Sequence, residues 1–131
     1  NVVATQDSAS TDANSLSHTY TMPSTAFGTT ETVTLGRISD NSRVVSVLVE
    51  VLTPLTGYAG GPTNQIPALE VGTTADPSRF MTEDQNDVEG QGSYTTTPDF
   101  HYAGTSELEI KVALSHLNAT AGEVKVTVTY V

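Results

Sequence analysis

Residues 43–52, RVVSVLVEVL, decide the fold class, because seven of these ten residues are apolar and valine dominates. Valine is a strand former, and successive side chains of a strand point to opposite faces. Alternation therefore gives this strand two apolar faces. One face carries Val45, Val47, Val49 and Val51, and the other carries Val44, Leu48 and Leu52 together with Ser46 and Glu50.

A strand with two apolar faces must be covered on both sides. In an antiparallel protein, a second sheet covers one face, and a neighbouring subunit is a candidate for the other. Without such a neighbour, Val44, Leu48 and Leu52 would form an exposed apolar patch. We therefore predict that these three residues contact another copy of the chain or another protein.

Two cleaner strands close the sequence. Residues 107–114, ELEIKVAL, and 123–131, EVKVTVTYV, alternate apolar with polar positions and are joined by a moderate loop. Shorter runs at 18–22, 33–35, 66–71 and 93–102 bring the expected total to about eight strands. This number and spacing predict an all-β protein with a single β-sandwich.

Two sandwich topologies remain open. Long, uneven connections at 53–65 and 78–92 favour a jelly-roll-like sandwich. The alternative is an immunoglobulin-like sandwich, which usually carries Cys and Trp landmarks; this chain has neither residue.

The first seventeen residues, NVVATQDSASTDANSLS, differ from the rest in composition. Ser, Thr, Ala, Asn and Asp dominate, and such a segment buries too little surface to fold alone. We predict an extended N-terminal arm at 1–17, followed by one sandwich domain at 18–131. Val2, Val3 and Leu16 are the expected apolar anchors of the arm on a partner.

The charge of the chain limits its partners. Fifteen acidic residues against five basic ones give a formal net charge of −10, and the bases are scattered. Nucleic acid requires a clustered basic face, and an anionic membrane surface disfavours so acidic a protein. We therefore expect no nucleic-acid partner and no membrane partner.

Catalytic and cofactor motifs do not occur in the sequence. The glycine cluster at 57–62 lacks the lysine of a phosphate loop, and His18, His101 and His116 lack any activating signature. The acidic loop 83–89, EDQNDVE, does not match an EF-hand, so we expect a solvated loop without a cation. The prediction is a protein with no catalytic residue, no metal site and no cofactor.

Three stretches together resemble small structural proteins of tailed-phage virions. They are LEVGTTADPSRFM at 69–81, GQGSY at 90–94 and AGEVKVTVTYV at 121–131. The resemblance implies a head decoration protein or a β-sandwich module of a tail or fibre, which binds rather than catalyses. It also implies a homo-oligomer, with a trimer favoured, located on the virion and most often on the capsid surface.

Residues 69–81 are themselves expected to form a structural corner rather than a ligand site. Pro77 fixes its own φ and disfavours helix at Asp76, and Gly72 allows a tight turn. Phe80 and Met81 can then fold back onto the sandwich.

Two functions follow from this sequence. The first is a capsid decoration, or cement, protein that binds the major capsid protein or another virion protein. The alternative is a receptor- or carbohydrate-binding module of a tail fibre, which the lack of Trp disfavours because sugars stack on aromatic rings.

Overall fold

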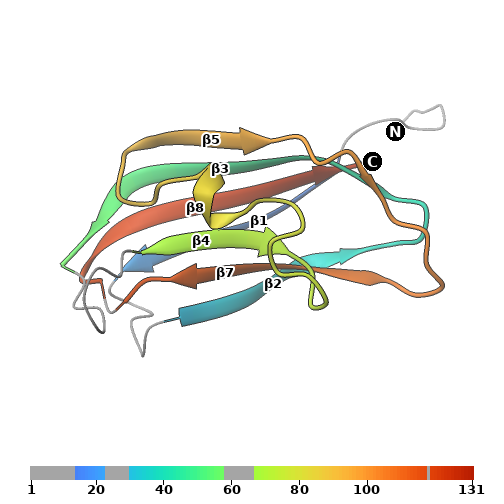
Figure 1. Ribbon diagram of the computed structural model, residues 1–131, viewed down its shortest axis with the longest axis horizontal. Coiled ribbons are helices and arrows are strands. Elements are labelled where there is room, and N and C mark those ends of the chain that lie inside the picture. The colour runs from blue at the N-terminus through green and yellow to red at the C-terminus, as the bar shows by residue number, and fades with distance from the viewer. Residues whose placement is uncertain (1–13, 23–29, 58–66, 118) are drawn as a thin grey trace.

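Two antiparallel sheets face each other in the computed structural model, which describes residues 14–22, 30–57, 67–117 and 119–131 (Figure 1). The larger sheet has the order β1-β8-β3-β5, and a short β6 also pairs with β3. Its strands are β1 (Asn14–Met22), β8 (Ala121–Tyr130), β3 (Arg43–Thr56), β5 (Gly92–Thr96) and β6 (Phe100–His101). The smaller sheet has the order β2-β7-β4, with β2 (Thr30–Ile38), β7 (Leu108–Ser115) and β4 (Ala68–Gly72). A 3₁₀ turn, η1, spans Glu83–Gln85.

The strand pairs are nested, so that the first half of the chain lies antiparallel to the second half. β1 pairs with β8, β2 with β7, and β3 with β6 and β5. The innermost pair is a single bridge between Val71 in β4 and Met81. A long hairpin rolled in this way, with successive strands shared between two sheets, is a jelly roll.

The predicted jelly-roll-like β-sandwich is therefore confirmed. An immunoglobulin-like sandwich would place its first two strands in the same sheet, whereas β1 and β2 lie in different sheets. A full jelly roll would pair one more strand with β4. Here that strand is reduced to the single bridge between Val71 and Met81.

The core lies between the two sheets and consists mainly of branched aliphatic residues. The β3–β8 ladder contributes three registered valine pairs from one side, namely Val47 with Val128, Val49 with Val126 and Val51 with Val124. The smaller sheet contributes Leu69, Val71, Ile110, Val112 and Leu114 from the other side. All of these side chains are buried, as the alternation in the sequence predicts.

Tyr20 adds a polar group to this core. Its hydroxyl lies 3.3 Å from the carbonyl oxygen of Val112 in the opposite sheet. Burial, and to a lesser degree the charge of Glu31, raises the pKa of the Tyr20 hydroxyl above its ordinary value. The hydroxyl therefore remains a neutral donor between the sheets.

The prediction that Val44 lies on the same face of its strand as Leu48 and Leu52 is wrong. Val44 is 0% exposed and lies in the core, because a β-bulge changes the alternation at the start of β3. Val44 pairs with Tyr130 and Ser46 with Thr129, so Val45 is the extra residue and is partly exposed. Val44 is thus not available to a partner.

The start of the chain also differs from the prediction. Residues 14–17, assigned from the sequence to the arm, form the first part of β1. Leu16 packs against the core and lies over Gly36 of β2, so it serves the sandwich itself. Val2 and Val3 lie outside the described residues.

Residues 69–81 form the expected corner at the end of β4. Thr73 N–H donates to the Asp76 carbonyl over 2.9 Å, and Asp76 N–H donates to the Thr73 hydroxyl over 3.0 Å. Phe80 N–H donates to the Val71 carbonyl oxygen, so the chain folds back onto β4. Phe80 and Met81 are thereby buried in the core. Gly72 is required for this corner because a Cβ there would overlap the backbone of Asp76 and Pro77.

We predict that Gly72→Ala destabilises the protein, because backbone rather than a movable side chain occupies the space. Overpacking of this kind costs about 1–3 kcal/mol and should lower the melting temperature by several degrees in calorimetry. Gly36→Ala is the matched control, since the neighbouring atoms are the flexible end of Leu16. Equal melting temperatures for the two variants would show that the corner is not tightly packed at Gly72.

Candidate interaction surfaces

The outer face of the larger sheet carries mainly small hydroxyl side chains, together with the charged residues Glu50, Glu123 and Lys125. These residues alternate along their strands with the buried residues and therefore point away from the core. We call this surface the hydroxyl face: Ser15, Ser17, Thr19 and Thr21 of β1, Thr127 and Thr129 of β8, Ser46 of β3, and Ser93 and Thr95 of β5. The sequence alternation contained this signal, but the Ser/Thr-rich start of the chain was assigned to an arm.

Leu48 lies on the hydroxyl face, partly exposed. Thr127 and Thr95 are its direct neighbours on the two flanking strands. Leu52, further along β3, is 44% exposed. The three-residue apolar patch predicted from the sequence is therefore reduced to two leucines, and Leu48 is surrounded by threonines rather than by other apolar groups.

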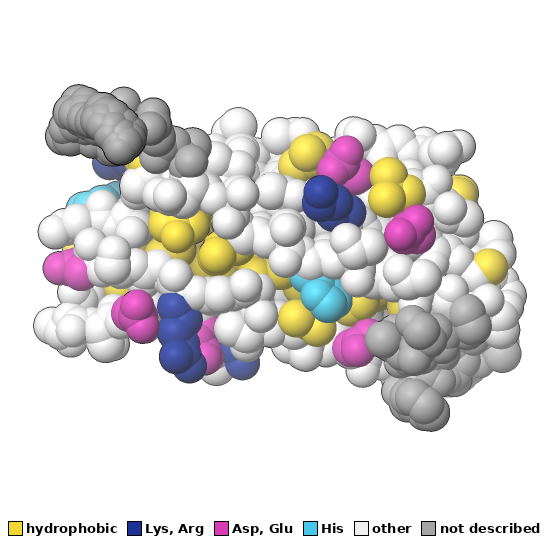
Figure 2. Space-filling model, turned by 180° about the vertical axis from the view of Figure 1, so that it is seen from behind, with side chains coloured by type: hydrophobic (Ala, Val, Ile, Leu, Met, Phe, Trp, Pro, Cys, Tyr) yellow, Lys and Arg dark blue, Asp and Glu magenta, His cyan; other side chains and the backbone are white. Residues whose placement is uncertain are grey.

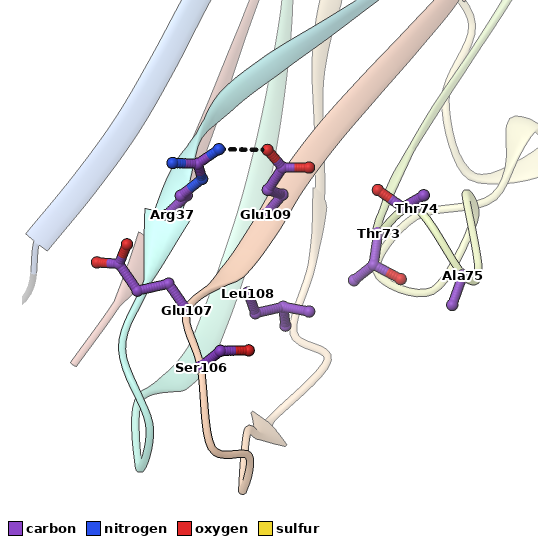
Figure 3. A pocket seen from close by; sticks show the side chains of 8 residues that line it. All are labelled: Arg37, Thr73, Thr74, Ala75, Ser106, Glu107, Leu108 and Glu109. Atoms are coloured by element: carbon purple, nitrogen blue, oxygen red, sulfur yellow. Dashed lines mark hydrogen bonds and ion pairs between the residues drawn. The ribbon is translucent and has the colours of Figure 1, made fainter.

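A second surface is a hollow of about 510 Å³ beside the corner. Figure 3 shows that the Thr73–Ala75 loop lies on one side and that Arg37 of β2 and Glu109 of β7 lie on the other. The guanidinium of Arg37 donates to the Glu109 carboxylate over 2.8 Å. This hydrogen bond and the positive charge lower the pKa of Glu109 below its ordinary value. The hollow is thus lined by this partly exposed ion pair and by a second carboxylate, that of Glu107.

The acidic loop is organised by hydrogen bonds within the protein. Thr82 N–H donates to the Gln85 side-chain oxygen over 2.9 Å, and Asn86 donates to the Leu69 carbonyl over 2.8 Å. One oxygen of Asp87 accepts the Glu89 N–H over 3.0 Å. Within the described residues, no three His, Cys, Asp or Glu side chains are placed to hold a metal ion together.

The three histidines lie on separate elements. His18 of β1 packs edge-on against Tyr20, with ring centroids 4.6 Å apart. His101 is exposed in β6, and His116 is buried in the connection from β7 to β8. Arg79, in the corner that follows β4, lies over the Phe100 ring, with its guanidinium carbon 4.6 Å from the ring centroid. Among the described residues, no helix is long and apolar enough to cross a membrane.

The fold is similar to that of chains in two phage capsid structures. A chain in the capsid asymmetric unit of cyanophage Pam1 superimposes with a TM-score of 0.67 over 99% of this chain and 91% of that chain, at 16% identity. A chain in the acid-stable capsid of Helicobacter pylori bacteriophage KHP30 superimposes with a TM-score of 0.62 over 90% and 86%, at 15% identity. No family model and no curated protein matches the sequence. The resemblance to phage virion proteins is thus confirmed at the level of the fold.

We predict that calcium does not stabilise the protein. A cation bound to the folded state alone would raise the melting temperature by mass action. Melting curves with millimolar calcium and with chelator should coincide. A calcium-dependent rise of several degrees that Asp87→Asn removes would establish a site in the acidic loop.

Proposed function

We propose that this protein is a non-enzymatic structural protein of a phage virion, and that it decorates the capsid. In this role it binds the outer surface of the shell of major capsid protein and stabilises the particle as a cement. The observation that carries the proposal is the shared fold, which covers nearly the whole of this chain and most of each chain taken from two phage capsid structures.

The hydroxyl face is the surface we propose for contact with the shell or with a neighbouring copy. Its small side chains allow another backbone to approach closely, and their hydroxyls can donate or accept hydrogen bonds. Leu48 and Leu52 provide apolar contacts within this polar surface. Interfaces commonly combine a few apolar anchors with a polar surround in this way.

We propose a homo-oligomer on the particle, with a trimer favoured. The number three rests on the resemblance, because decoration and fibre proteins commonly occupy threefold axes. A contact role for Val2 and Val3 is part of the same proposal and concerns residues outside the described part of the chain.

The first prediction concerns copy number. A decoration protein covers the shell, so quantitative gel analysis of purified particles should give copies comparable in number to the major capsid protein. A handful of copies per particle would instead support a module of a tail or fibre.

The second prediction concerns the contact surface. Leu48→Lys and Leu52→Lys should each weaken attachment to particles that lack the protein, because each places a charge where the proposed contact would bury a leucine. Loss of one buried leucine corresponds to about 1.5–3 kcal/mol, or roughly a ten- to hundredfold weaker binding in a sedimentation assay.

Thr32→Lys is the matched control for this experiment. Thr32 is an exposed, outward-facing residue of β2 in the other sheet, so its substitution adds the same charge to a different surface. Unchanged attachment of both leucine variants, or equal weakening by the control, would contradict the proposed surface.

A further inference from the structure

Four of the five basic residues of the chain lie against carboxylates. Three of them form ion pairs over 2.8 to 3.8 Å, and the fourth lies directly across from a glutamate in the β3–β8 ladder. With the basic residue given first, the pairs are Arg37 with Glu109, Arg43 with Asp99, Lys111 with Glu109, and Lys125 with Glu50. Figure 2 shows basic side chains next to acidic ones on one side of the molecule.

Arg79 is the exception. Its side chain is exposed, and it forms no ion pair with any other residue that the structure describes. The guanidinium is held over the Phe100 ring by cation–π attraction. A ring packed against the face of a guanidinium leaves the N–H groups in its plane able to donate. Arg79 is therefore an oriented donor whose charge is not balanced by a neighbouring carboxylate.

Arg79 lines a hollow of about 510 Å³ between the corner and the end of β5, which we call the Arg79 hollow. The other described residues that line it are uncharged, and most carry a hydroxyl or an amide, such as Ser78, Thr95, Thr97 and Gln85. The side-chain oxygen of Gln85 accepts the Thr82 N–H, so its amide nitrogen remains as a donor. The lining thus combines one positive charge with several neutral hydrogen-bonding groups.

The nearest acidic residues in the sequence are directed elsewhere. Glu83 and Asp84 line a separate hollow beside the start of β4. Asp99 accepts a hydrogen bond from Arg43 over 2.9 Å. The Arg79 hollow therefore keeps its positive charge although acidic residues flank it in the sequence.

Two other hollows that contain a basic residue also contain a carboxylate. Arg37 and Glu109 line the hollow beside the corner, and Lys111 and Glu70 line one on the smaller sheet. With a formal net charge of −10, the protein repels anions in general. An anion that approaches it would thus find its favourable contact at Arg79 rather than at these paired bases.

We propose that the Arg79 hollow binds the carboxylate of an aspartate or glutamate side chain of the shell protein. A guanidinium can donate two parallel hydrogen bonds to one carboxylate. The hollow adjoins the hydroxyl face, because Thr95 belongs to both. A protein that packs on the hydroxyl face is therefore within reach of Arg79. The choice of the shell as partner rests on the proposed function.

The lining favours an amino-acid side chain over an acidic sugar. Sugars stack on open aromatic rings. Phe80 lines the hollow but is only 3% exposed, and Phe100 is covered by Arg79. The aromatic residues described here thus provide no platform for a sugar ring.

The three arginine side chains give a direct test, because each has its own Nε–H signal in the NMR spectrum of the isotope-labelled full chain. Sodium acetate, compared with sodium chloride at the same ionic strength, should shift the Arg79 signal in a saturable way. The signals of Arg37 and Arg43 should move less, since each guanidinium already donates to a carboxylate. Arg79→Lys identifies the signal by removing it. A shift of Arg79 no larger than that of the other two arginines would overturn the proposal.

Sodium glucuronate, a sugar that carries a carboxylate, is the second probe in the same titration. Acetate and glucuronate should bind with similar affinity, because the carboxylate makes the main contact. Binding of glucuronate about tenfold more tightly than acetate, or tighter still, would show that the sugar hydroxyls are also recognised. That result would assign the hollow to an acidic sugar and overturn the proposed partner.

Attachment to particles that lack the protein tests the partner. Arg79→Glu should weaken attachment about tenfold or more, because two carboxylates would then face each other. Arg37→Glu is the matched control, since it changes the net charge equally on the smaller sheet and should retain attachment. Circular dichroism verifies that both variants fold.

Three outcomes of this experiment would count against the proposal. Equal attachment of the two variants would overturn the contact with the shell. Dissociation of a homo-oligomer by Arg79→Glu in the absence of particles would assign the hollow to a second copy and would also overturn it. A wild-type chain that attaches to no particle would overturn the proposed function together with the shell as partner, whereas the acetate titration decides separately whether the carboxylate site exists.

Discussion

The backbone ladder between β3 and β8 is the interaction on which the rest of the structure depends. It joins a strand from the first half of the chain to the last strand, and it brings three pairs of valines into register on the core side. β3 and β8 are the two central strands of the larger sheet, and β1 and β5 pair with their outer sides. Pairing of residues so distant in sequence has a large loop-closure cost, and the dense valine contact offsets it.

The nested pairing that surrounds this ladder explains how the surfaces arise. Because the chain returns along itself, its early strands β1 and β2 become outer strands of the two sheets. The hydroxyl face spans β1, β8, β3 and β5, so residues from 15 to 129 share one surface. A function based on contact requires such a surface and does not require a cavity with aligned catalytic groups.

The sequence predicted much of this fold where a single strand contained the whole signal. Alternation in residues 107–114 and 123–131 matches β7 and β8, and the corner at 69–81 was inferred correctly from Gly72 and Pro77. The error at Val44 came from a bulge, which depends on the partner strand and leaves no mark in the alternation of β3. The sequence analysis began the first strand too late, at residue 18, because serine and threonine are typical of arms. Only pairing with β8 makes residues 14–17 part of β1. The hydroxyl face was missed because its β1 residues were assigned to the arm and because its other residues come from three further strands.

An image reconstruction of the intact virion tests the central claim most directly. A capsid decoration role predicts jelly-roll density repeated over the outside of the shell, with the hydroxyl face of the β1-β8-β3-β5 sheet against the shell or against a neighbouring copy. Density confined to the tail or to fibre tips would contradict the claim. Density on the shell with the hydroxyl face fully open to solvent would retain the role and reject the contact surface.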